Sequence, residues 1–245
     1  MFFTNYPQTL YKFGNETSYA AMQNISVYVD LIDQIKDNVN FYQYYYIQDG
    51  ERADTVSYKL YNSVRYYWTL YLLNDNLRES GWPLSTQQIL LKAQTDYPYM
   101  VLTTRDINTL LTHFLVGDSV VGQSSGATGT VIKRNLDLGQ IVVSQDNGQE
   151  FLDTELLRDN IDPEFPQNIQ LVSSVDEYLA THHYEDSNGV FTDVDPYSTP
   201  SVLLTPITYL DRYQAANDSL RTIRILKSGA IDQVFRSYQE ALRSV

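Results

Sequence analysis

Residues 42–82 read YQYYYIQDGERADTVSYKLYNSVRYYWTLYLLNDNLRESGW, and this stretch decides the fold expected for the centre of the chain. Phe41–Ile47 is aromatic and β-branched, which favours a strand. The strand is expected to end at Gly50, because glycine adopts positive φ without strain. Apolar side chains three and four positions apart then predict helices over Ala53–Tyr61 and Val64–Leu73. Asn62 separates them and suits the left-handed backbone of a helix break.

Composition and charge disfavour several classes of function. The chain has 245 residues, 43% hydrophobic and 19% charged, as in ordinary globular proteins, and its 21 Tyr favour protein–protein surfaces as well as cores. Lys and Arg number 17 against 30 Asp and Glu, so a net charge of −13 predicts repulsion from nucleic acid and from anionic membranes. The lack of Cys excludes disulfides and thiolate metal sites. Without a signal peptide or a long apolar run, we expect a soluble protein made in the cytoplasm.

Further elements are predicted on both sides of residues 42–82. Met1 to Gly14 alternates aromatic and small polar residues and is expected to be an extended arm. Apolar residues at helical spacing predict helices over Tyr19–Val39 and Arg105–Phe114. A capping pattern at Ser85-Thr86-Gln87-Gln88 predicts the start of another helix, which ends at Pro98. Towards the C-terminus we expect a helix over Ile207–Leu220, a strand over Thr222–Leu226 and a helix over Ala230–Arg243.

A change of pattern at Val116 predicts a small antiparallel β-unit. Short runs of Val and Ile alternate there with Gly-rich turns, and Thr130–Lys133 and Gln140–Ser144 read as partner strands. The acidic, proline-containing segment Asp153–Pro166 is expected to be a surface linker. Beyond it, a hairpin is predicted in which Glu177–Glu185 and Val190–Val194 flank a turn at Asn188-Gly189. The fold class is therefore expected to be α+β.

Few residues suggest active-site chemistry. Gly122, Gly126 and Gly129 lack the Gly-Lys-Ser/Thr ending of a phosphate-binding loop, which favours turn glycines. His182 and His183 are adjacent on an expected strand, where neighbouring side chains point to opposite faces, so we do not expect them to share a metal ion. No carboxylate pair stands apart as an acid and a base. The sequence predicts no catalytic residue, no cofactor and no metal.

The stretch at residues 42–82 resembles a LysM module, a small βααβ unit best known for binding glycans that contain N-acetylglucosamine. The matching residues are Tyr45-x-Ile47-x-x-Gly50-Glu51, then Val56 and Ser57, Tyr61-Asn62 at the break, and Trp68 through Asn74. The sequence departs from the module at Asn62, where glycine is common, and after Asn76, where the usual short second strand with its proline is missing.

Larger parts of the chain resemble a baseplate wedge subunit of contractile-tailed bacteriophages of the T-even type. The resemblance lies in FFTNYP and YKFG, in YYIQDGERADTVSYKLYNSVRYYW with its LLNDN and GW continuation, in HHYEDSNGVFTDVDPY and in NDSLRTIRILKSGAIDQVF. Val116 to Phe151 reads as an insertion relative to shorter members. We expect an N-terminal arm and helix (1–40), a LysM-like module with following helices (41–115), an inserted small β-domain (116–160), and a hairpin with a helix–strand–helix that completes the main body (161–245).

The resemblance implies a non-enzymatic clamp that joins neighbouring wedges during baseplate assembly, with its LysM-like part used for protein contacts. The implied location is the virion tail, assembled in the host cytoplasm. The implied partners are other wedge proteins, neighbouring wedges and tail-tube or sheath-initiating proteins, without nucleic acid, membrane or small-molecule substrate. Since consecutive helical positions diverge by about 100°, the aromatic residues 66–68 and 71 cannot all face one core. The interface candidates are Phe2, Phe3, Tyr6, Tyr45, Tyr66, Tyr67, Trp68, Tyr71, Trp82, Phe235 and Tyr238.

Two other classes of function stay open on the sequence. A LysM-type module that binds glycan or peptidoglycan explains the signature without any assembly. A cell-wall hydrolase requires a second, catalytic domain, for which little unassigned sequence remains.

Overall fold

The computed structural model describes residues 8–15, 17–23, 40–159 and 166–244, and the chain divides into two compact units. The split unit combines Met1–Thr86 with Ala216–Val245, and the barrel unit is Gln87–Ala215. The chain passes between them at the start of α5 (Thr86–Asp96) and within α7 (Tyr209–Ser219). Helices and strands occur together in the described residues, which confirms the predicted α+β class.

The first described strands form an antiparallel hairpin, β1 (Gln8–Tyr11) and β2 (Ala20–Gln23). The arm expected at Met1 to Gly14 is therefore paired rather than free over its described part. The helix expected over Tyr19–Val39 is wrong at residues 20–23, because a turn with Gly14 at φ 52° brings β1 within hydrogen-bonding reach of them. Residues 24–39 lie outside the described residues.

The strand and helices expected within residues 42–82 are present. The elements are β3 (Tyr42–Tyr46), α2 (Ala53–Tyr61), the 3-10 turn η2 (Val64–Tyr66), α3 (Tyr67–Leu73) and α4 (Asp75–Ser80). Asn62 ends α2 with φ 53°, and its N–H donates to the Tyr58 carbonyl at 2.8 Å, so the expected left-handed break is confirmed.

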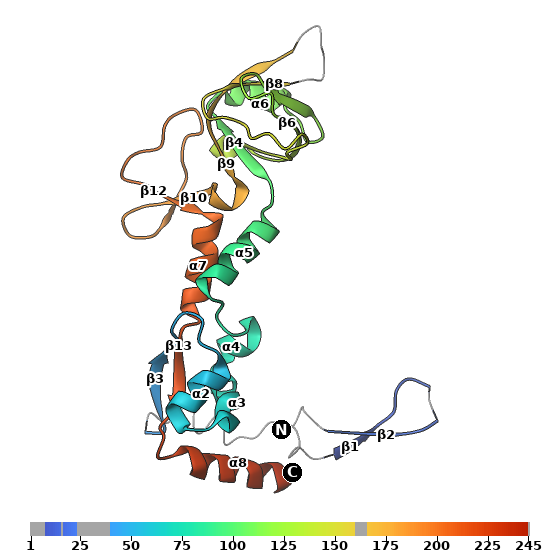
Figure 1. Cartoon of the computed structure of the whole chain (residues 1–245), viewed down its shortest axis with the longest axis vertical. Coiled ribbons are helices and arrows are strands. Elements are labelled where there is room, and N and C mark those ends of the chain that lie inside the picture. The colour runs from blue at the N-terminus through green and yellow to red at the C-terminus, as the bar shows by residue number, and fades with distance from the viewer. Residues whose placement is uncertain (1–7, 16, 24–39, 160–165, 245) are drawn as a thin grey trace. The chain divides into compact units, whose positions relative to one another are not determined.

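The strand that pairs with β3 comes from far along the chain. β13 (Thr222–Leu226) lies antiparallel beside it, with Thr222 opposite Tyr46 and Leu226 opposite Tyr42 (Figure 1). α2, α3 and α4 share an apolar core with this sheet, made by Ile47, Val56, Leu70, Leu77, Ile223 and Ile225. The expected C-terminal helix, α8 (Ile231–Ser244), follows β13 and adds a cluster of Leu73, Leu226, Ile231 and Val234.

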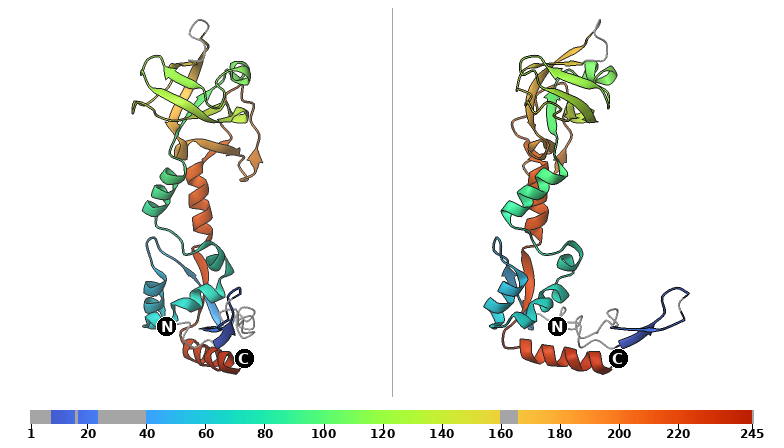
Figure 2. Two further views of the ribbon diagram at one scale, coloured as in Figure 1. Left: turned by 90° about the vertical axis from the view of Figure 1, so that its right-hand side faces the viewer. Right: turned by 45° about the vertical axis from the view of Figure 1, so that its right-hand side comes forward.

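Within the described residues, six strands of the barrel unit close an antiparallel barrel (Figure 2). They are β4 (Met100–Thr104), β5 (Ser119–Gly122), β6 (Thr128–Asn135), β7 (Gln140–Val143), β8 (Leu156–Asp159) and β9 (Asn168–Asp176), in the order β4-β7-β6-β5-β8-β9. Inward-facing side chains fill the interior, and α6 (Ile107–Thr112) adds Ile107 and Leu110 to the same core.

The barrel corrects the range expected for the β-unit. β6 and β7 confirm the partner strands expected at Thr130–Lys133 and Gln140–Ser144, but β4 and β9 lie outside residues 116–160. The expectation of a linker over Asp153–Pro166 is wrong at β8, which pairs with both β5 and β9. Leu157 of β8 is 0% exposed and packs in the barrel core. The Asp and Pro residues around it favour a loop when only the local sequence is considered, which is why the strand was not predicted.

A three-stranded sheet lies beside the barrel in the same unit. Its strands are β10 (Thr181–Glu185), β11 (Phe191–Thr192) and β12 (Thr205–Thr208), in the order β11-β10-β12. The predicted hairpin is thus confirmed, although its first part, Glu177–Leu179, forms the 3-10 turn η4 instead of a strand. A separate 3-10 turn, η3 (Leu136–Leu138), connects β6 to β7. The helix expected from Ile207 begins at Tyr209, because Thr205–Thr208 pairs with β10. No helix in the described ranges is both long and apolar enough to cross a membrane.

Candidate functional site

Most of the predicted interface residues belong to the split unit as it is described. Phe2, Phe3 and Tyr6 lie outside the described residues. The remaining candidates lie on β3, η2, α3 and α8 and in the segment after α4. Apart from Tyr45, whose hydroxyl donates to Glu51, they fall into an internal aromatic cluster and a surface hollow.

The internal cluster joins α8 to α3. Trp68 and Tyr238 are 6% and 4% exposed, with ring centroids 5.0 Å apart. Phe235 contacts Trp68 at 5.9 Å and Tyr66 at 5.5 Å between centroids. The Tyr66 hydroxyl donates to Asp232 Oδ1 at 2.5 Å, and this hydrogen bond raises the pKa of Tyr66. The rings of Trp68 and Tyr238 therefore pack inside the unit, and little of their surface is exposed to contact another protein.

The surface hollow brings three other candidates together. Tyr67, Tyr71 and Trp82 line it with residues 52–54, and its volume is about 450 Å³. The Tyr71 and Trp82 rings lie 5.8 Å apart, and Trp82 Nε1 donates to the Glu51 carbonyl at 2.6 Å. Tyr67 is 42% exposed at its rim. The hollow therefore presents fixed aromatic faces next to the charged side chains of Arg52 and Asp54.

The carboxylate of Glu51 holds the turn between β3 and α2. It accepts hydrogen bonds from the Tyr45 hydroxyl and from the Gln48 N–H, both at 2.9 Å, and pairs with Lys59. Burial of Tyr45 and its bond to Glu51 raise the pKa of Tyr45 to about 12. Burial opposes ionisation of Glu51, but Lys59, Gln48 and Tyr45 outweigh it and keep its pKa below the usual value. The candidate Tyr45 thus has a structural partner inside its own turn.

Sequence reasoning missed Arg221, which directly precedes β13 and connects it to the turn after β3. Its guanidinium donates to Asp49 Oδ1 and to Asp218 Oδ1, both at 2.9 Å, and to the Ile47 carbonyl at 3.4 Å. The side chain is 7% exposed. Asp49 belongs to the turn after β3, but no local pattern pairs it with a residue so far along the chain.

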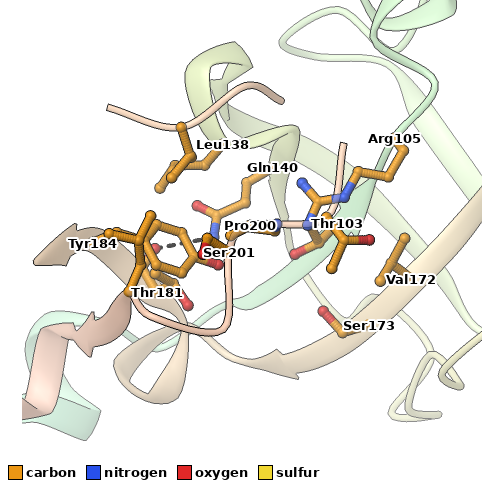
Figure 3. Close-up of a pocket in the computed structure, with 13 residues that line it drawn as sticks. Thr103, Arg105, Leu138, Gln140, Val172, Ser173, Thr181, Tyr184, Pro200 and Ser201 are labelled. Carbon is orange, nitrogen blue, oxygen red and sulfur yellow. Dashed lines mark hydrogen bonds between the residues drawn. The ribbon is translucent and has the colours of Figure 1, made fainter. Parts of the chain in front are cut away.

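The barrel unit contains a cavity of about 350 Å³ between the barrel and the three-stranded sheet (Figure 3). Gln140 is one of its lining residues and donates from Nε2 to the Thr181 carbonyl at 3.0 Å. Arg105 donates from Nη1 to the Pro196 carbonyl at 3.4 Å, and its Nε has no partner among the described residues. The lining residues include hydroxyls and one cation but no carboxylate or imidazole, so this cavity offers no general base next to a nucleophile.

The two adjacent histidines approach each other, contrary to expectation. His182 Nδ1 and His183 Nδ1 are 2.9 Å apart, and His183 Nε2 lies 3.1 Å from Glu185 Oε1. The cause is a break in the register between β10 and β12 at Thr181 to His183, which disturbs the alternation of side chains along the strand. Burial, together with Arg212, His183 and Lys133, lowers the pKa of His182. Within the described ranges, no three His, Asp or Glu side chains gather as ligands for a metal ion.

The Gly-rich loop before β6 surrounds a carboxylate of the chain itself. The N–H groups of Ser124 and Ser125 both donate to Glu155 Oε2 at 3.0 Å, and the Leu152 N–H donates to Oε1 at 2.7 Å. Glu155 is 4% exposed. Gly126 has φ 70°, as expected of a turn glycine, and a Cβ on Gly122 would collide with the Glu155 carboxylate. The amides that a phosphate loop would offer are thus already occupied.

No protein-family model matches the chain, and no curated protein matches it either.

Proposed function

We propose that this chain is a structural, non-enzymatic subunit of a contractile phage tail baseplate, which clamps neighbouring wedges together during assembly. The observation that carries the proposal is the pairing of β3 with β13. This pairing joins two of the segments on which the phage resemblance rests, YYIQDGERADTVSYKLYNSVRYYW and NDSLRTIRILKSGAIDQVF, in one small sheet.

The proposal includes a LysM-like module whose second strand comes from the C-terminal region. β3, α2, α3 and β13 follow one another in the order of a βααβ unit, and their sheet is antiparallel. The strand that the sequence lacks after Asn76 is then supplied by Thr222–Leu226, with the barrel unit inserted between the second helix and the second strand.

A role in assembly agrees with the chemistry of the described residues. The carboxylates of Glu51 and Glu155 are engaged in structural hydrogen bonds. By contrast, Tyr44, Tyr46 and Tyr67 are 65%, 53% and 42% exposed and are suited to protein contacts.

Reconstitution of the baseplate tests the proposal. The other wedge subunits encoded in the same genome would be coexpressed with and without this chain, and the products would be separated on density gradients and imaged by electron microscopy. We expect closed rings that contain the chain, and only separate wedges in its absence. Rings that form in equal yield without it would contradict the proposal. A turbidity assay on bacterial cell walls should show no lysis by the purified chain.

The aromatic hollow gives a specific reason to test glycan binding as a second candidate. Aromatic rings beside charged groups are usual walls of a sugar site, and the hollow supplies both. Its rings are those of Tyr71 and Trp82, inclined by 51° to each other, and its charged groups are Arg52 and Asp54. Calorimetric titration with N-acetylglucosamine oligomers decides between the two. Heat that is lost in Tyr67→Ala but kept in Tyr58→Ala, an exposed tyrosine outside the hollow, would favour glycan binding, whereas the clamp predicts no heat.

A further inference from the structure

One end of the three-stranded sheet carries exposed apolar side chains. Val190, 58% exposed, directly precedes β11, and Phe191, 61% exposed, is its first residue. Val202 and Leu203, 98% and 81% exposed, lie in the loop before β12. Glu185 of β10 is opposite Phe191 on one side and opposite Thr205 on the other, so both pairs lie at the same end of the sheet. These four residues are called the apolar tip below.

The loop that carries Val202 and Leu203 has a defined shape. The Leu204 N–H donates to the Ser201 carbonyl at 3.0 Å, and the Leu203 N–H donates to Ser201 Oγ at 3.3 Å. Val202 and Leu203 therefore occupy the central positions of a hydrogen-bonded turn. Gly, Asn, Asp and Pro are favoured at such positions, and a β-branched residue there has no local conformational advantage. The turn holds two aliphatic side chains out into water.

The neighbouring turn is equally well fixed. Asp186 Oδ1 accepts hydrogen bonds from the N–H of Asn188 at 2.8 Å and of Val190 at 2.9 Å. The ring of Phe191 stacks on His183, with centroids 5.4 Å apart and planes inclined by 19°. The apolar tip is thus preorganised on both sides, which reduces the conformational entropy lost when it binds.

The charge around the apolar tip indicates what covers it. Between Arg158 and Arg212 the sequence has no other Lys or Arg, while Glu185, Asp186 and Asp193 lie close in sequence to Val190 and Phe191. Arg105, which follows β4, also reaches this region, and its guanidinium donates to the Pro196 carbonyl in the loop before β12. A second copy of the chain would bring like charges together, and an anionic membrane would repel them. An apolar cleft with Lys or Arg at its rim complements both the aliphatic centre and the acidic surround.

We propose that the apolar tip inserts into an apolar cleft, rimmed by Lys or Arg, on another protein of the baseplate. The identity of the partner as a baseplate protein rests on the proposed function. Val202 and Leu203 form the centre of the contact, because they are the most exposed of the four side chains. Truncation of side chains at the centre of an interface weakens binding most. The surrounding carboxylates make the association weaker at high ionic strength.

The test is incorporation of full-length variants into coexpressed wedges, measured by the amount of chain that cosediments with them. We expect the double variant Val202→Ser with Leu203→Ser to reduce incorporation by about tenfold or more. The matched control is Leu152→Ser with Leu156→Ser, whose side chains are 51% and 45% exposed elsewhere in the same unit and should leave incorporation unchanged. Thermal unfolding of the tip variant should match that of the wild type, which separates loss of contact from loss of fold.

The possible outcomes distinguish the inference from the proposed function. Incorporation of the tip variant at the wild-type level would overturn the inference and leave the clamp intact. Failure of the wild type to cosediment with wedges would overturn both. Flotation of the wild type, but not of the variant, with phosphatidylcholine–phosphatidylglycerol vesicles would assign the tip to lipid instead. Sedimentation equilibrium that shows a dimer lost in the variant would assign it to a second copy.

Discussion

Arg221 shows how one buried side chain connects segments that are distant in sequence. Its guanidinium is 7% exposed, whereas the partners Asp49 and Asp218 are 54% and 63% exposed. If the arginine is removed, water can therefore solvate both carboxylates, and no buried charge is left without a partner. The expected loss is that of its charged hydrogen bonds, and the larger penalty for breaking a fully buried pair does not apply.

We expect Arg221→Met to lower the free energy of unfolding of the split unit by about 1.5–3 kcal/mol. Tryptophan emission during urea unfolding measures this, because the 2 Trp of the chain, Trp68 and Trp82, both lie in the split unit. The control is Arg52→Met, whose ion pair with Asp54 is 80% and 48% exposed and should contribute less than about 1 kcal/mol. Equal effects of the two substitutions would contradict a special role for the buried guanidinium.

Glu155 makes the barrel unit sensitive to acid. Burial opposes its ionisation, but hydrogen bonds from Ser125, Leu152 and Ser124 outweigh it and hold the pKa of the carboxyl below its ordinary value of 4.5. A carboxyl whose pKa is lower in the folded state contributes its full stability above the unfolded value. That contribution is lost as the pH falls through the folded value.

We expect Glu155→Gln to destabilise the loop before β6 by about 1–3 kcal/mol at neutral pH, because an amide brings N–H donors towards the N–H groups of Ser124 and Ser125. Hydrogen exchange over β5 and β6, corrected for intrinsic rates, reports the loss of protection. The wild type should lose protection below about pH 4.5, and the variant should lack this step. Exposed Glu150, changed to Gln, should behave as the wild type does.

At the scale of elements, β13 belongs to the core formed by residues 42–82. Ile223 and Ile225 are 0% and 1% exposed and pack with Val56 and Leu70 of α2 and α3. Their burial, more than the strand propensity of residues 222–226, accounts for the pairing with β3.

Ile225→Ala should lower the stability of the split unit by about 2–5 kcal/mol, since it leaves a cavity among well-packed neighbours. Tryptophan emission in urea again follows this unit. Thr222→Ala, on the exposed side of the same strand, should change the midpoint little. An unchanged midpoint for Ile225→Ala would mean that β13 is dispensable to this core.

The helices and strands differ in how well they could be predicted from the sequence. α2, α3 and α8 could be predicted because a helix shows its buried stripe within its own residues. β4 could not, because Met100, Val101 and Leu102 are all buried and show no alternation. β8 is only 4 residues long, and its partners β5 and β9 are defined by barrel closure rather than by local pattern.

The same limit applies to the candidate sites. Tyr67 and Tyr71 could be placed on one helix from their spacing, and helical geometry required that some aromatic side chains turn away from the core. The roles of Arg221 and Glu155 depend on partners brought close only by tertiary structure. The contact of His182 with His183 depends on a register shift between β10 and β12 that strand alternation alone does not predict.

At the scale of the whole molecule, the split unit holds its own two crossing points together. The Leu84 N–H donates to Asn217 Oδ1 at 2.7 Å, and Asn217 Nδ2 donates to the Leu84 carbonyl at 3.1 Å. The chain therefore leaves and re-enters this unit at adjacent positions. An insert joined at such positions does not interrupt the packing of its host.

We expect that replacing residues 87–215 by a short Gly-Ser linker leaves a folded split unit. Its tryptophan emission and its cooperative urea transition should resemble those of the full chain, since Trp68 stays buried. Residues 87–215 expressed alone should show protected amides in the barrel strands. Emission typical of solvent-exposed tryptophan in the shortened chain would show that the split unit needs the insert in order to fold.

The pairing of β3 with β13 also sets an order of events during protein synthesis. About 180 residues separate Tyr46 from its partner Thr222, so at about 5–20 residues per second the ribosome needs on the order of 10–35 s to deliver the second strand. During this interval Phe41–Gln48, which contains no charged residue, has no complementary strand, and every strand of the barrel is synthesised before Thr222 is reached. The nascent chain thus passes through a state in which the barrel is complete and an uncharged aromatic segment is open to aggregation, and slow translation or a scarcity of chaperones would lower the yield of the protein at that stage.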